Sequence, residues 1–447
     1  MAIELSNITF TDEDDIVPVS GVEEILNTGI ANTLAGSDTI IGTGAPDAAF
    51  GKGIYNLGTL NTDDDNDIVI GTGNIFGILN LGTLNTGNGN DEITGIGDQD
   101  LNSDAYSYGI FLQGGILDTG NGDDIITGTV AGIAQGSRGT GIYLNSSSLN
   151  TGDGNDTITG YGNGTGIHTN YLGNIDTGKG DDIVTGTDSF IGISNFTLLN
   201  TSEGNDTIIG NGFIGIQNMG MFNTGDGNDI ILVNSDGSNS LYNDLGGTID
   251  TGEGNDIISS NGLIFNNDGT INTSNGEDSI ISYGGFDNSG VVSLGEGNDS
   301  IIVDADIFNP GLRNFNLIDT GDGDDTITST RGIYNQGMVN TGNGNDSIIA
   351  NEGFESAENS SGAWFLGEGE DYIKGFGSGN FYGGNGNDTL ELTPGTYTVG
   401  IWGEGGESVI FTKGNQLMIT SEFEKLKAAS TIYDFTSLTA GQIIILA

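Results

Sequence analysis

Aspartate recurs through this chain in a glycine-rich motif whose oxygen atoms are suited to a metal ion. The segment Leu149–Gly160 reads LNTGDGNDTITG, and close copies begin at Leu84, Leu117 and Ile175. Its glycines favour a loop with positive φ that turns successive backbone carbonyls inward, and a carboxylate closes the loop. Carbonyl and carboxylate oxygens are hard ligands, and an irregular loop suits the roughly six to eight ligands of Ca²⁺ better than the strict octahedron of Mg²⁺. The motif therefore predicts calcium binding.

Fifteen aspartates occupy the same place in the repeat, and two residues after each comes Ile, Val or Leu. If the repeats stack about 4.8 Å apart, neighbouring carboxylates repel by roughly 3.5 kcal/mol at an effective dielectric constant near 20. Either the carboxylates spread into solvent or cations lie between the coils. Asp, Asn and Gly also favour turns, so a turn without metal remains an alternative.

We predict that the column holds several Ca²⁺ ions. The expected ligands are the carboxylates and glycine carbonyls of Asp91, Asp124, Asp156, Asp182, Asp229, Asp256, Asp299, Asp325, Asp346, Asp371, Asp388, Gly152, Gly154, Gly384 and Gly386. Motif glycines are replaced in the coils that end at Asp67, Asp206 and Asp278, so these are expected to be weaker sites.

The motif must be positioned by short strands, because its aspartates lie only 17 to 33 residues apart. Each interval contains three strand signals: the residues after the aspartate, a Gly-Ile-x-Asn segment, and the apolar residue that enters the next motif. This pattern predicts an all-β fold, a parallel β-helix or β-solenoid with about three short strands per coil. The asparagines of the second segment should form a buried amide ladder, with members Asn56, Asn195, Asn218, Asn243, Asn266 and Asn335.

The repeat also suggests a division of the chain. Residues 1–30 lack the motif and are predicted to cap the solenoid or to donate a strand to a neighbour. Residues 31–390 form the solenoid, and residues 391–447 form a small β-rich C-terminal cap. Within this cap, Ser421–Glu424 matches a capping box and predicts a short helix through about Ala429.

Composition excludes several partners. The chain has 62 acidic residues, 9 basic residues and a net charge of −53, which argues against nucleic acid and against docking on anionic lipid. No apolar run approaches the roughly 18 residues of a membrane span, so no membrane insertion is expected. Cysteine is absent, and the single histidine, His168, has no motif around it. We therefore expect no catalytic residues and no enzyme activity.

The motif resembles the nonapeptide G-G-x-G-x-D-x-U-x of the repeats-in-toxin (RTX, haemolysin-type) calcium-binding proteins, and segment 383–391, GGNGNDTLE, matches it at every position. The resemblance implies a parallel β-roll with Ca²⁺ between its turns. Family rolls have two nonapeptides per coil, whereas this chain has one in a longer coil. The C-terminal part, with YDFTSLTAGQ near its end, is similar to the uncleaved type I secretion signal of cyanobacterial members. This implies an extracellular or cell-surface location without a cleaved N-terminal signal.

These observations predict a secreted calcium-binding structural protein of the cell surface or extracellular matrix. It is expected to self-associate, end to end or laterally, into filaments or a surface layer. The alternative is a carbohydrate-binding or carbohydrate-active β-helix, such as a lyase or epimerase, with a cell-surface polysaccharide as partner. An ice-binding surface is a further alternative, because the motif threonines are regular, although the coils are unequal in length.

Overall fold

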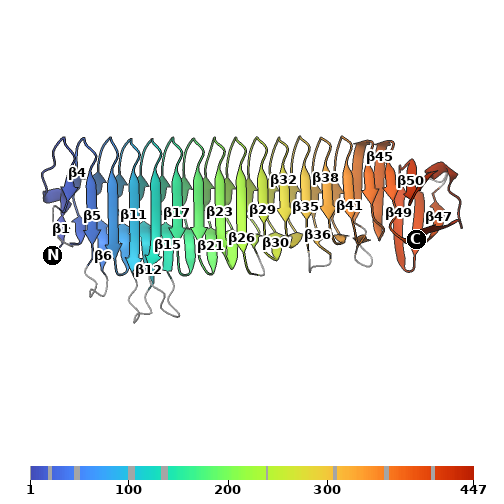
Figure 1. Cartoon of the computed structure of the whole chain (residues 1–447), viewed down its shortest axis with the longest axis horizontal. Helices are drawn as coiled ribbons and strands as arrows, with labels where there is room; N and C mark the ends of the chain where they lie inside the picture. Colours follow the sequence, from blue (N-terminus) through green and yellow to red (C-terminus); the bar gives the residue numbers. More distant parts are fainter. Residues whose placement is uncertain are drawn as a thin grey trace. The chain divides into compact units, whose positions relative to one another are not determined.

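The chain folds as an all-β parallel β-solenoid, as the repeat predicts. A computed structural model describes residues 2–18, 23–44, 51–98, 106–131, 139–237, 240–305, 310–356, 362–403 and 408–446. The strands belong to three sheets, here named A, B and C, and the chain visits them in turn in each coil (Figure 1). They form two compact units: unit 1 is Met1–Tyr242 with Gly247–Asp250, and unit 2 is Asn243–Gly246 with Thr251–Ala447.

In unit 1 the strands of each sheet pair in parallel with the equivalent strands of neighbouring coils. Sheet A contains β1 (Ile3–Glu4), β3 (Ile25–Asn27), β6 (Lys52–Asn56), β9 (Phe76–Asn80), β12 (Ser107–Gln113), β15 (Gly139–Asn145), β18 (Thr165–Asn170), β21 (Ile191–Asn195) and β24 (Ile214–Asn218). Sheet B contains β2 (Ile16–Val17), β5 (Thr39–Thr43), β8 (Ile68–Gly73), β11 (Glu92–Asp98), β14 (Ile125–Ala131), β17 (Thr157–Tyr161), β20 (Ile183–Thr187), β23 (Thr207–Gly212) and β26 (Ile230–Ser235). Sheet C contains β4 (Ile30–Asn32), β7 (Thr59–Asn61), β10 (Thr83–Asn85), β13 (Ile116–Asp118), β16 (Ser148–Asn150), β19 (Asn174–Asp176), β22 (Leu198–Asn200), β25 (Met221–Asn223) and β28 (Thr248–Asp250).

Unit 2 continues the same three-sheet pattern, and the chain passes into it through β27 (Leu241–Asn243). Sheet A contains β30 (Ile264–Asn267), β33 (Gly285–Asn288), β36 (Leu312–Asn314), β39 (Ile333–Asn335) and β42 (Phe354–Glu355). Sheet B contains β29 (Ile257–Ser260), β32 (Ser279–Ser282), β35 (Ser300–Val303), β38 (Thr326–Ser329), β41 (Ser347–Ala350), β44 (Tyr372–Lys374), β46 (Thr389–Glu391), β50 (Lys425–Ala428) and β51 (Thr431–Asp434). Sheet C contains β31 (Thr270–Asn272), β34 (Val291–Ser293), β37 (Leu317–Asp319), β40 (Met338–Asn340), β43 (Ala363–Gly369), β45 (Gly379–Gly386), β47 (Gly395–Trp402), β48 (Ser408–Lys413), β49 (Gln416–Ser421) and β52 (Ile443–Leu446).

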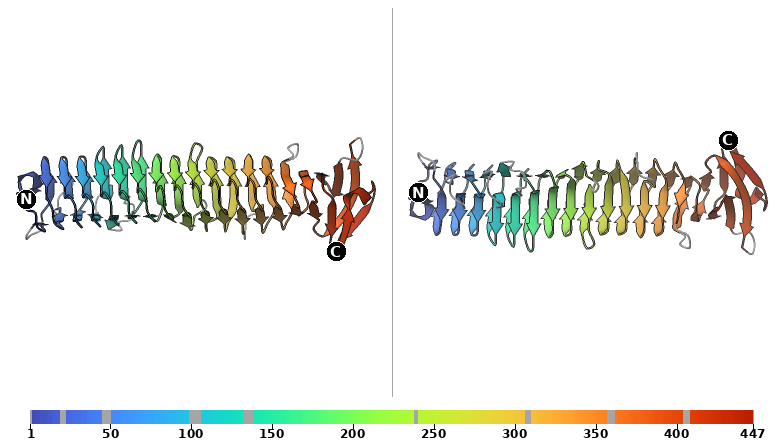
Figure 2. Two further views of the ribbon diagram at one scale, coloured as in Figure 1. Left: turned by 90° about the horizontal axis from the view of Figure 1, so that it is seen from above. Right: turned by 90° about the horizontal axis from the view of Figure 1, so that it is seen from below.

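Alternation of buried and outward residues explains why these short segments are strands. In β17, Ile158 is fully buried, while Thr157 and Thr159 on either side point outward. Ile158 lies in register with Ile126 of the preceding coil and with a buried valine of the next one. Within each unit the coils stack one on the next (Figure 2), and each coil adds buried apolar residues to a core between the three sheets, which no single coil could bury alone.

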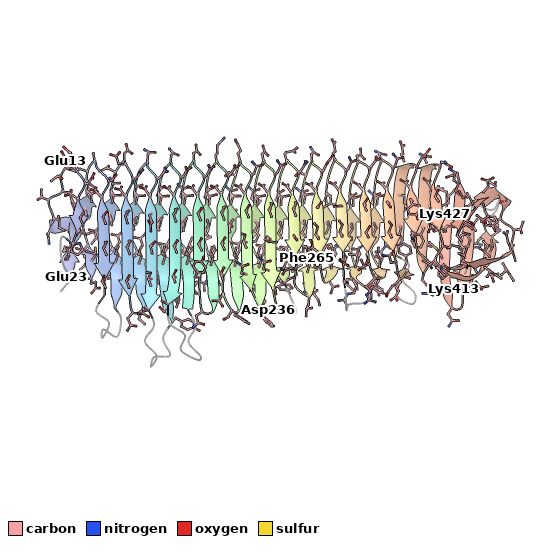
Figure 3. The ribbon with its side chains drawn as sticks, in the orientation of Figure 1. Glu13, Glu23, Asp236, Phe265, Lys413 and Lys427 are labelled. Atoms are coloured by element: carbon pink, nitrogen blue, oxygen red, sulfur yellow. The ribbon has the colours of Figure 1, made fainter. Side chains whose placement is uncertain are left out.

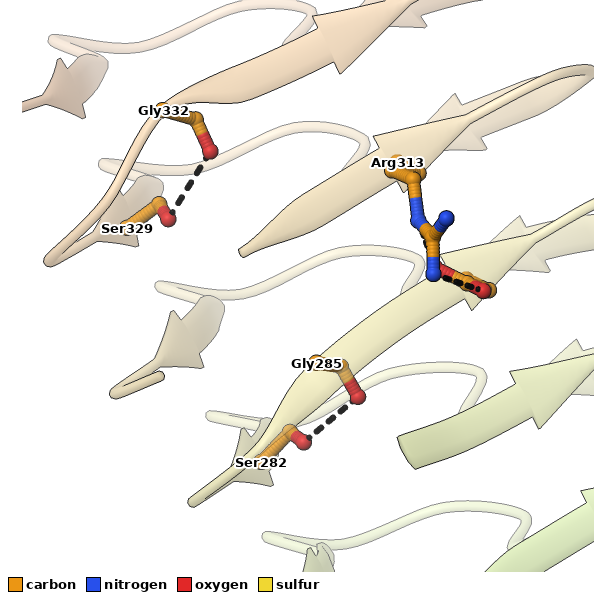
Figure 4. Close-up of polar contacts among 6 residues, drawn as sticks. Ser282, Gly285, Arg313, Ser329 and Gly332 are labelled. Carbon is orange, nitrogen blue, oxygen red and sulfur yellow. Dashed lines mark hydrogen bonds and ion pairs between the residues drawn. The ribbon is translucent and has the colours of Figure 1, made fainter. Parts of the chain in front are cut away.

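The corner between sheets B and A in unit 2 is held by serine side chains. The hydroxyl of Ser282 donates to the carbonyl of Gly285 at 3.0 Å, and that of Ser329 donates to Gly332 at 3.2 Å (Figure 4). Both hydroxyls are buried, so these bonds satisfy polar groups that would otherwise cost free energy. In the same unit, Phe265 fills the core beneath sheet A (Figure 3).

The corner between sheets A and C carries the predicted asparagine ladder, with one error of register. Asn195 Nδ2 donates to Asn218 Oδ1 at 2.9 Å, and Asn314 Nδ2 donates to Asn335 Oδ1 at 2.9 Å. Asn266, however, points outward, and its neighbour Asn267 occupies the ladder. The prediction was wrong because Phe265 is the buried residue of this strand, and the next inward position lies two residues later.

The predicted helix after Ser421 is also wrong. Residues Lys425–Ala428 form strand β50, in which Leu426 and Ala428 are buried and the lysines face outward. This strand pairs in parallel with β46 and antiparallel with β51, so sheet pairing outweighs the local capping-box preference. The strands expected between residues 390 and 420 are confirmed as β47, β48 and β49, which pair antiparallel.

The helical content of the described residues is limited to two 3₁₀ turns, η1 (Leu5–Asn7) and η2 (Phe435–Ser437). Accordingly, none of the described segments is a helix long and apolar enough to span a membrane. Residues 1–30 contribute β1, β2 and β3 to the first coils of unit 1. Whether residues 1–30, 31–390 and 391–447 act as separate functional segments stays a prediction.

Candidate metal centre

The motif forms the corner between sheets C and B, with its residues alternately outside and inside. In the copy after β16, Thr151 and Asp156 are buried, whereas Asp153 and Asn155 are exposed. The buried Leu149 and Ile158 anchor the two strands on either side of the corner. Every motif aspartate is at most 1% exposed, so the carboxylates are not spread into solvent. This burial is what separates the motif from an ordinary solvated turn.

One oxygen of each carboxylate is used to join coils. The backbone N–H of Asp124 donates to Asp156 Oδ1 at 2.8 Å, and that of Asp91 donates to Asp124 Oδ1 at the same distance. The same contact recurs at 2.7–2.9 Å along unit 1 from Asp15 to Asp229 and along unit 2 from Asp256 to Asp388. We call this row of carboxylates the aspartate column.

The second carboxylate oxygen is buried and in most coils accepts no hydrogen bond of standard geometry, although the hydroxyl of the motif threonine lies beside the carboxylate. This holds for Oδ2 of Asp38, Asp67, Asp91, Asp124, Asp156, Asp206, Asp278, Asp299, Asp325, Asp346, Asp371 and Asp388. In Asp182, by contrast, Oδ2 accepts a hydrogen bond from the hydroxyl of Thr177. A buried carboxylate oxygen without a partner carries a desolvation cost that a bound cation would remove.

Burial also changes the acidity of these groups. Desolvation raises the pKa of Asp124 and Asp182 to about 8, and that of Asp91, Asp156 and Asp325 to about 6. A neighbouring motif threonine lowers each of these pKa values, but by less than burial raises it. Without a cation, therefore, part of the column is protonated at neutral pH.

The motif threonines line the inner side of the corner. The hydroxyl of Thr151 donates to the carbonyl of Thr177 in the next coil at 3.2 Å, and that of Thr341 donates to Leu366 at 3.0 Å. In the last copy Gly383 takes the place of threonine, and a Cβ there would lie 2.7 Å from Asp388 Oδ2. The side of the carboxylate that lacks a donor thus faces the position of the motif threonine.

The motif glycines are required by the close approach of the coils. Gly152 has φ of 82° and Gly154 has φ of 157°. A Cβ on Gly154 would lie 1.8 Å from the carbonyl oxygen of Gly122, and one on Gly178 would lie 1.9 Å from that of Gly152. Gly384 and Gly386 lie equally close to carbonyl oxygens of the preceding motif. Each of these glycine carbonyls therefore packs against the glycine of the next coil, which leaves no room for a side chain there.

The donor set fits a hard cation in chemistry. The corner offers carboxylate, carbonyl and hydroxyl oxygens, and its structure uses no imidazole or thiolate. Within the described ranges, no three acidic or histidine side chains gather at one point, because the carboxylates lie in single file. A calcium ion here would be held by the carboxylate of Asp124 or an equivalent residue, with backbone carbonyls supplying further ligands. When bound, it supplies the positive charge that the column lacks.

The three coils expected to be weaker have the same backbone as the others. Asp63, Asp65, Ser202 and Ser274 replace motif glycines but keep positive φ values of 63–93°. Asp67, Asp206 and Asp278 are buried like the other members of the column. The difference lies in strain, because a non-glycine residue in this region costs roughly 1–2 kcal/mol.

Two residues that end the column were missed from the sequence. Glu424 Oε2 accepts the backbone N–H of Asp388 at 2.8 Å and so replaces the next aspartate. At the other end, the backbone N–H of Asp15 donates to Asp38 Oδ1 at 2.7 Å. Glu424 lies 36 residues after Asp388 and outside any motif copy, so repeat spacing could not identify it. Its only sequence signal was its place in Ser421–Glu424, which was interpreted as a capping box.

A carbohydrate-binding surface would need exposed aromatic faces, and aromatic residues gather on the outer face of sheet A. In unit 1 this face carries a row of aromatic rings: Phe76 and Tyr108 stack at 5.4 Å, and Tyr143 and His168 stack at 5.1 Å. Rings stacked on one another present edges to solvent, so they lack the free faces on which sugars pack. In unit 2 the same face holds an ion pair in which Arg313 donates to Asp287 at 2.5 and 2.6 Å (Figure 4).

No family model and no curated protein matches the chain. Among solved structures, the chain is similar to the crystal structure of a hyperactive, Ca²⁺-dependent, β-helical antifreeze protein from an Antarctic bacterium. The identity is 17%, the TM-score is 0.37, and the match covers 96% of each chain. This likeness is too distant for any property of the antifreeze protein to be transferred to this chain.

Proposed function

We propose that this chain is a secreted structural β-solenoid that binds several Ca²⁺ ions along its aspartate column. The observation that supports the proposal is the row of buried carboxylate oxygens without hydrogen-bond donors. Repeated in successive coils, these oxygens leave negative charge in a place that water does not reach. Calcium bound between coils would satisfy that charge and join neighbouring coils.

The structural role and the extracellular location are part of the same proposal. Calcium is abundant outside cells, and a solenoid that needs it would fold after export. The RTX-like motif and the type I secretion-like C-terminal segment support this route. The high content of acidic residues and the lack of a nucleophile or phosphate-loop motif in the sequence favour a structural role over an enzyme.

Calcium binding is tested by calorimetric titration of the full chain with CaCl₂. Adjacent residues provide a matched pair of variants: Asp124 is buried with a free Oδ2, and Asp123 is exposed and accepts the N–H of Asn155 at 2.9 Å. We expect Asp124→Asn to lower the calcium stoichiometry or the affinity of at least one site by about tenfold or more. Asp123→Asn should leave both unchanged.

A second pair in unit 2, Asp325→Asn and Asp324→Asn, repeats the comparison independently. Asp325 Oδ2 is buried without a donor, while Asp324 is exposed and accepts the N–H of Asn345 at 2.7 Å. If the wild-type chain shows no calcium heat, or if both variants of a pair reduce binding equally, the aspartate column is not the calcium site.

A further inference from the structure

The outer face of sheet B in unit 1 is free of charge from β14 to β26, in a very acidic protein, whereas β11 beside it exposes Glu92 and Asp98. The face is formed by the outward residues of β14, β17, β20, β23 and β26, which are Thr, Ile, Leu, Tyr, Asn, Ser and Ala. Figure 1 shows these strands side by side. The chain as a whole has 62 acidic residues, and the neighbouring motif corner exposes acidic side chains such as Asp123, Asp153 and Asp181. We call this surface the neutral face.

The residues nearest the motif alternate in size along the neutral face. Parallel pairing places Ile125, Thr157, Ile183, Thr207 and Ile230 in one column. The three isoleucines are 48%, 42% and 37% exposed, which is high for β-branched apolar residues in a sheet. Ile183 therefore projects above a shallower threonine on either side, and Ile125 lies between Thr157 and Glu92.

We propose that the neutral face is a lateral interface between two copies of this chain. Because the chain carries a net charge of −53, two copies repel wherever their acidic surfaces meet, and a neutral face lets them approach. Consider a second copy that faces the first across a two-fold axis running along the strands, between β17 and β20. Ile183 of one copy then lies opposite Thr157 of the other. The same operation places Ile125 opposite Thr207, so over β14–β23 large residues meet small ones in both copies, and Ile230 lies at the edge of the contact, opposite Glu92.

This alternation favours a second copy over a crystalline surface. A lattice such as ice or an insoluble polysaccharide repeats one spacing and would be matched by identical residues in successive coils. Isoleucine and threonine instead alternate, so the large residues of one copy can lie opposite the small residues of another. The stacked rings on sheet A differ again, because their faces already contact one another.

The expected interface is modest. Five strands, each contributing about five residues, cover roughly 400 Å² per copy, below the roughly 800 Å² per partner of a standard interface. In unit 2, the outward residues of β29, β32, β35, β38 and β41 are likewise free of charge, so that unit offers a similar face by itself. We therefore expect concentration-dependent association rather than an obligate dimer.

The inference rests on the proposed function in one respect, because calcium is expected to order the coils that form the face. It is tested by sedimentation velocity of the full chain at saturating CaCl₂ over a range of protein concentrations. We expect wild type to associate, and Ile183→Glu to raise the apparent dissociation constant at least about tenfold. The matched control is Ile116→Glu on sheet C, since Ile116 is 45% exposed and Ile183 is 42% exposed.

Circular dichroism of each sample shows whether the β-fold is intact. A wild-type chain with an intact spectrum that stays monomeric at the highest concentration would overturn the inference. So would equal loss of association in Ile183→Glu and Ile116→Glu, or sedimentation of a monomeric chain with cellulose, chitin or ice. If association persists with an intact spectrum after chelation, the interface stands and calcium dependence alone fails.

Discussion

Two buried polar ladders run along this solenoid, and only one of them is closed. In the asparagine ladder, which Leu112 and Leu144 interrupt in unit 1, an amide can both donate and accept: Asn195 donates to Asn218 and to the carbonyl of Met221, and accepts from Thr169. In the aspartate column, Oδ1 accepts a backbone N–H while Oδ2 remains without a donor in most coils. A neutral amide has a donor and an acceptor in one side chain, so amides in successive coils can hydrogen-bond to one another without another partner. A carboxylate has acceptors only, so its column needs donors or cations from elsewhere.

The largest effect should come from removing calcium, which acts on one ladder and not on the other. A chelator leaves the carboxylates buried and uncompensated, so we expect the melting temperature to fall by about 10 °C or more. Hydrogen exchange should accelerate first in peptides that cover the motif corner, such as residues 149–160. Peptides that cover the asparagine ladder, such as residues 191–200, should lose protection later. Equal acceleration in both regions would show that the two ladders do not differ in this way.

The calcium-free protein should lose stability as pH rises. Burial raises the pKa of the column carboxylates from 3.8 to about 6–8, for example in Asp67, Asp124 and Asp346. The unfolded state releases these protons near pH 4, whereas the folded state keeps them until about pH 6–8. The stability that the bound protons contribute is therefore fully present below about pH 4 and is lost as the pH rises through 6–8. Differential scanning calorimetry in chelator at pH 5 and pH 8 measures the change.

Saturating calcium should flatten this pH profile, because the ion replaces the protons of the column. The combined variant Asp124→Asn and Asp325→Asn should also flatten it in chelator. The exposed pair, Asp123→Asn and Asp324→Asn, reports the general effect of reducing net charge. If both pairs change the slope equally, the profile reflects the whole protein and not the column.

Placing a charge in the closed ladder should destabilise the protein whether or not calcium is present. In the wild-type chain, Asn195 Nδ2 lies 2.9 Å from Asn218 Oδ1 and 3.0 Å from the carbonyl oxygen of Met221. In Asn195→Asp, a carboxylate oxygen would replace this donor and face the same two oxygens. An uncompensated buried charge costs about 3–5 kcal/mol, and no oxygen-rich corner is there to bind a cation. Denaturant unfolding with and without calcium provides the measurement, and rescue by calcium would contradict the expectation.

The smallest effect should be the reverse exchange, Asp124→Asn, and its sign should depend on calcium. Asparagine can keep the Oδ1 acceptor for Asp91 N–H and removes the charge from the buried position. We expect a loss of about 1–3 kcal/mol in saturating calcium and a gain in chelator. A loss of the same size under both conditions would mean that the aspartate matters for packing and not for a cation.

Periodicity in the sequence was sufficient to predict the three-sided solenoid and the alignment of the aspartates in one column, but it left open whether their carboxylates are buried or face solvent. It failed where local and tertiary signals compete. At Asn266 the strand contains consecutive apolar and amide residues, and only packing of Phe265 decides which asparagine faces inward. After the capping-box residues Ser421–Glu424 the chain forms strand β50 and not a helix, because β46 offers a free edge for pairing.

Other features depend on geometry that no single sequence position reveals. Whether a carboxylate keeps one or two partners follows from the spacing of adjacent coils, so the free Oδ2 of Asp156 could not be anticipated. The neutral face likewise appears only when parallel pairing places Ile125, Thr157 and Ile183 in one column. Its residues are separated by 26 or 32 positions along the chain, with acidic residues between them.

The hydrogen bonds of the aspartate column all run in one direction, and this gives the two ends of the chain different tolerance to shortening. Each coil offers an N–H that is accepted by the coil that follows it, and Glu424 closes the series after Asp388. Trimming from the start of the chain removes donors and leaves a carboxylate that water can solvate. Deletion from the C-terminal end removes an acceptor and leaves a backbone N–H without a hydrogen-bond partner in the chain. Deletion series made from the two ends should therefore give shortened chains of unequal solubility.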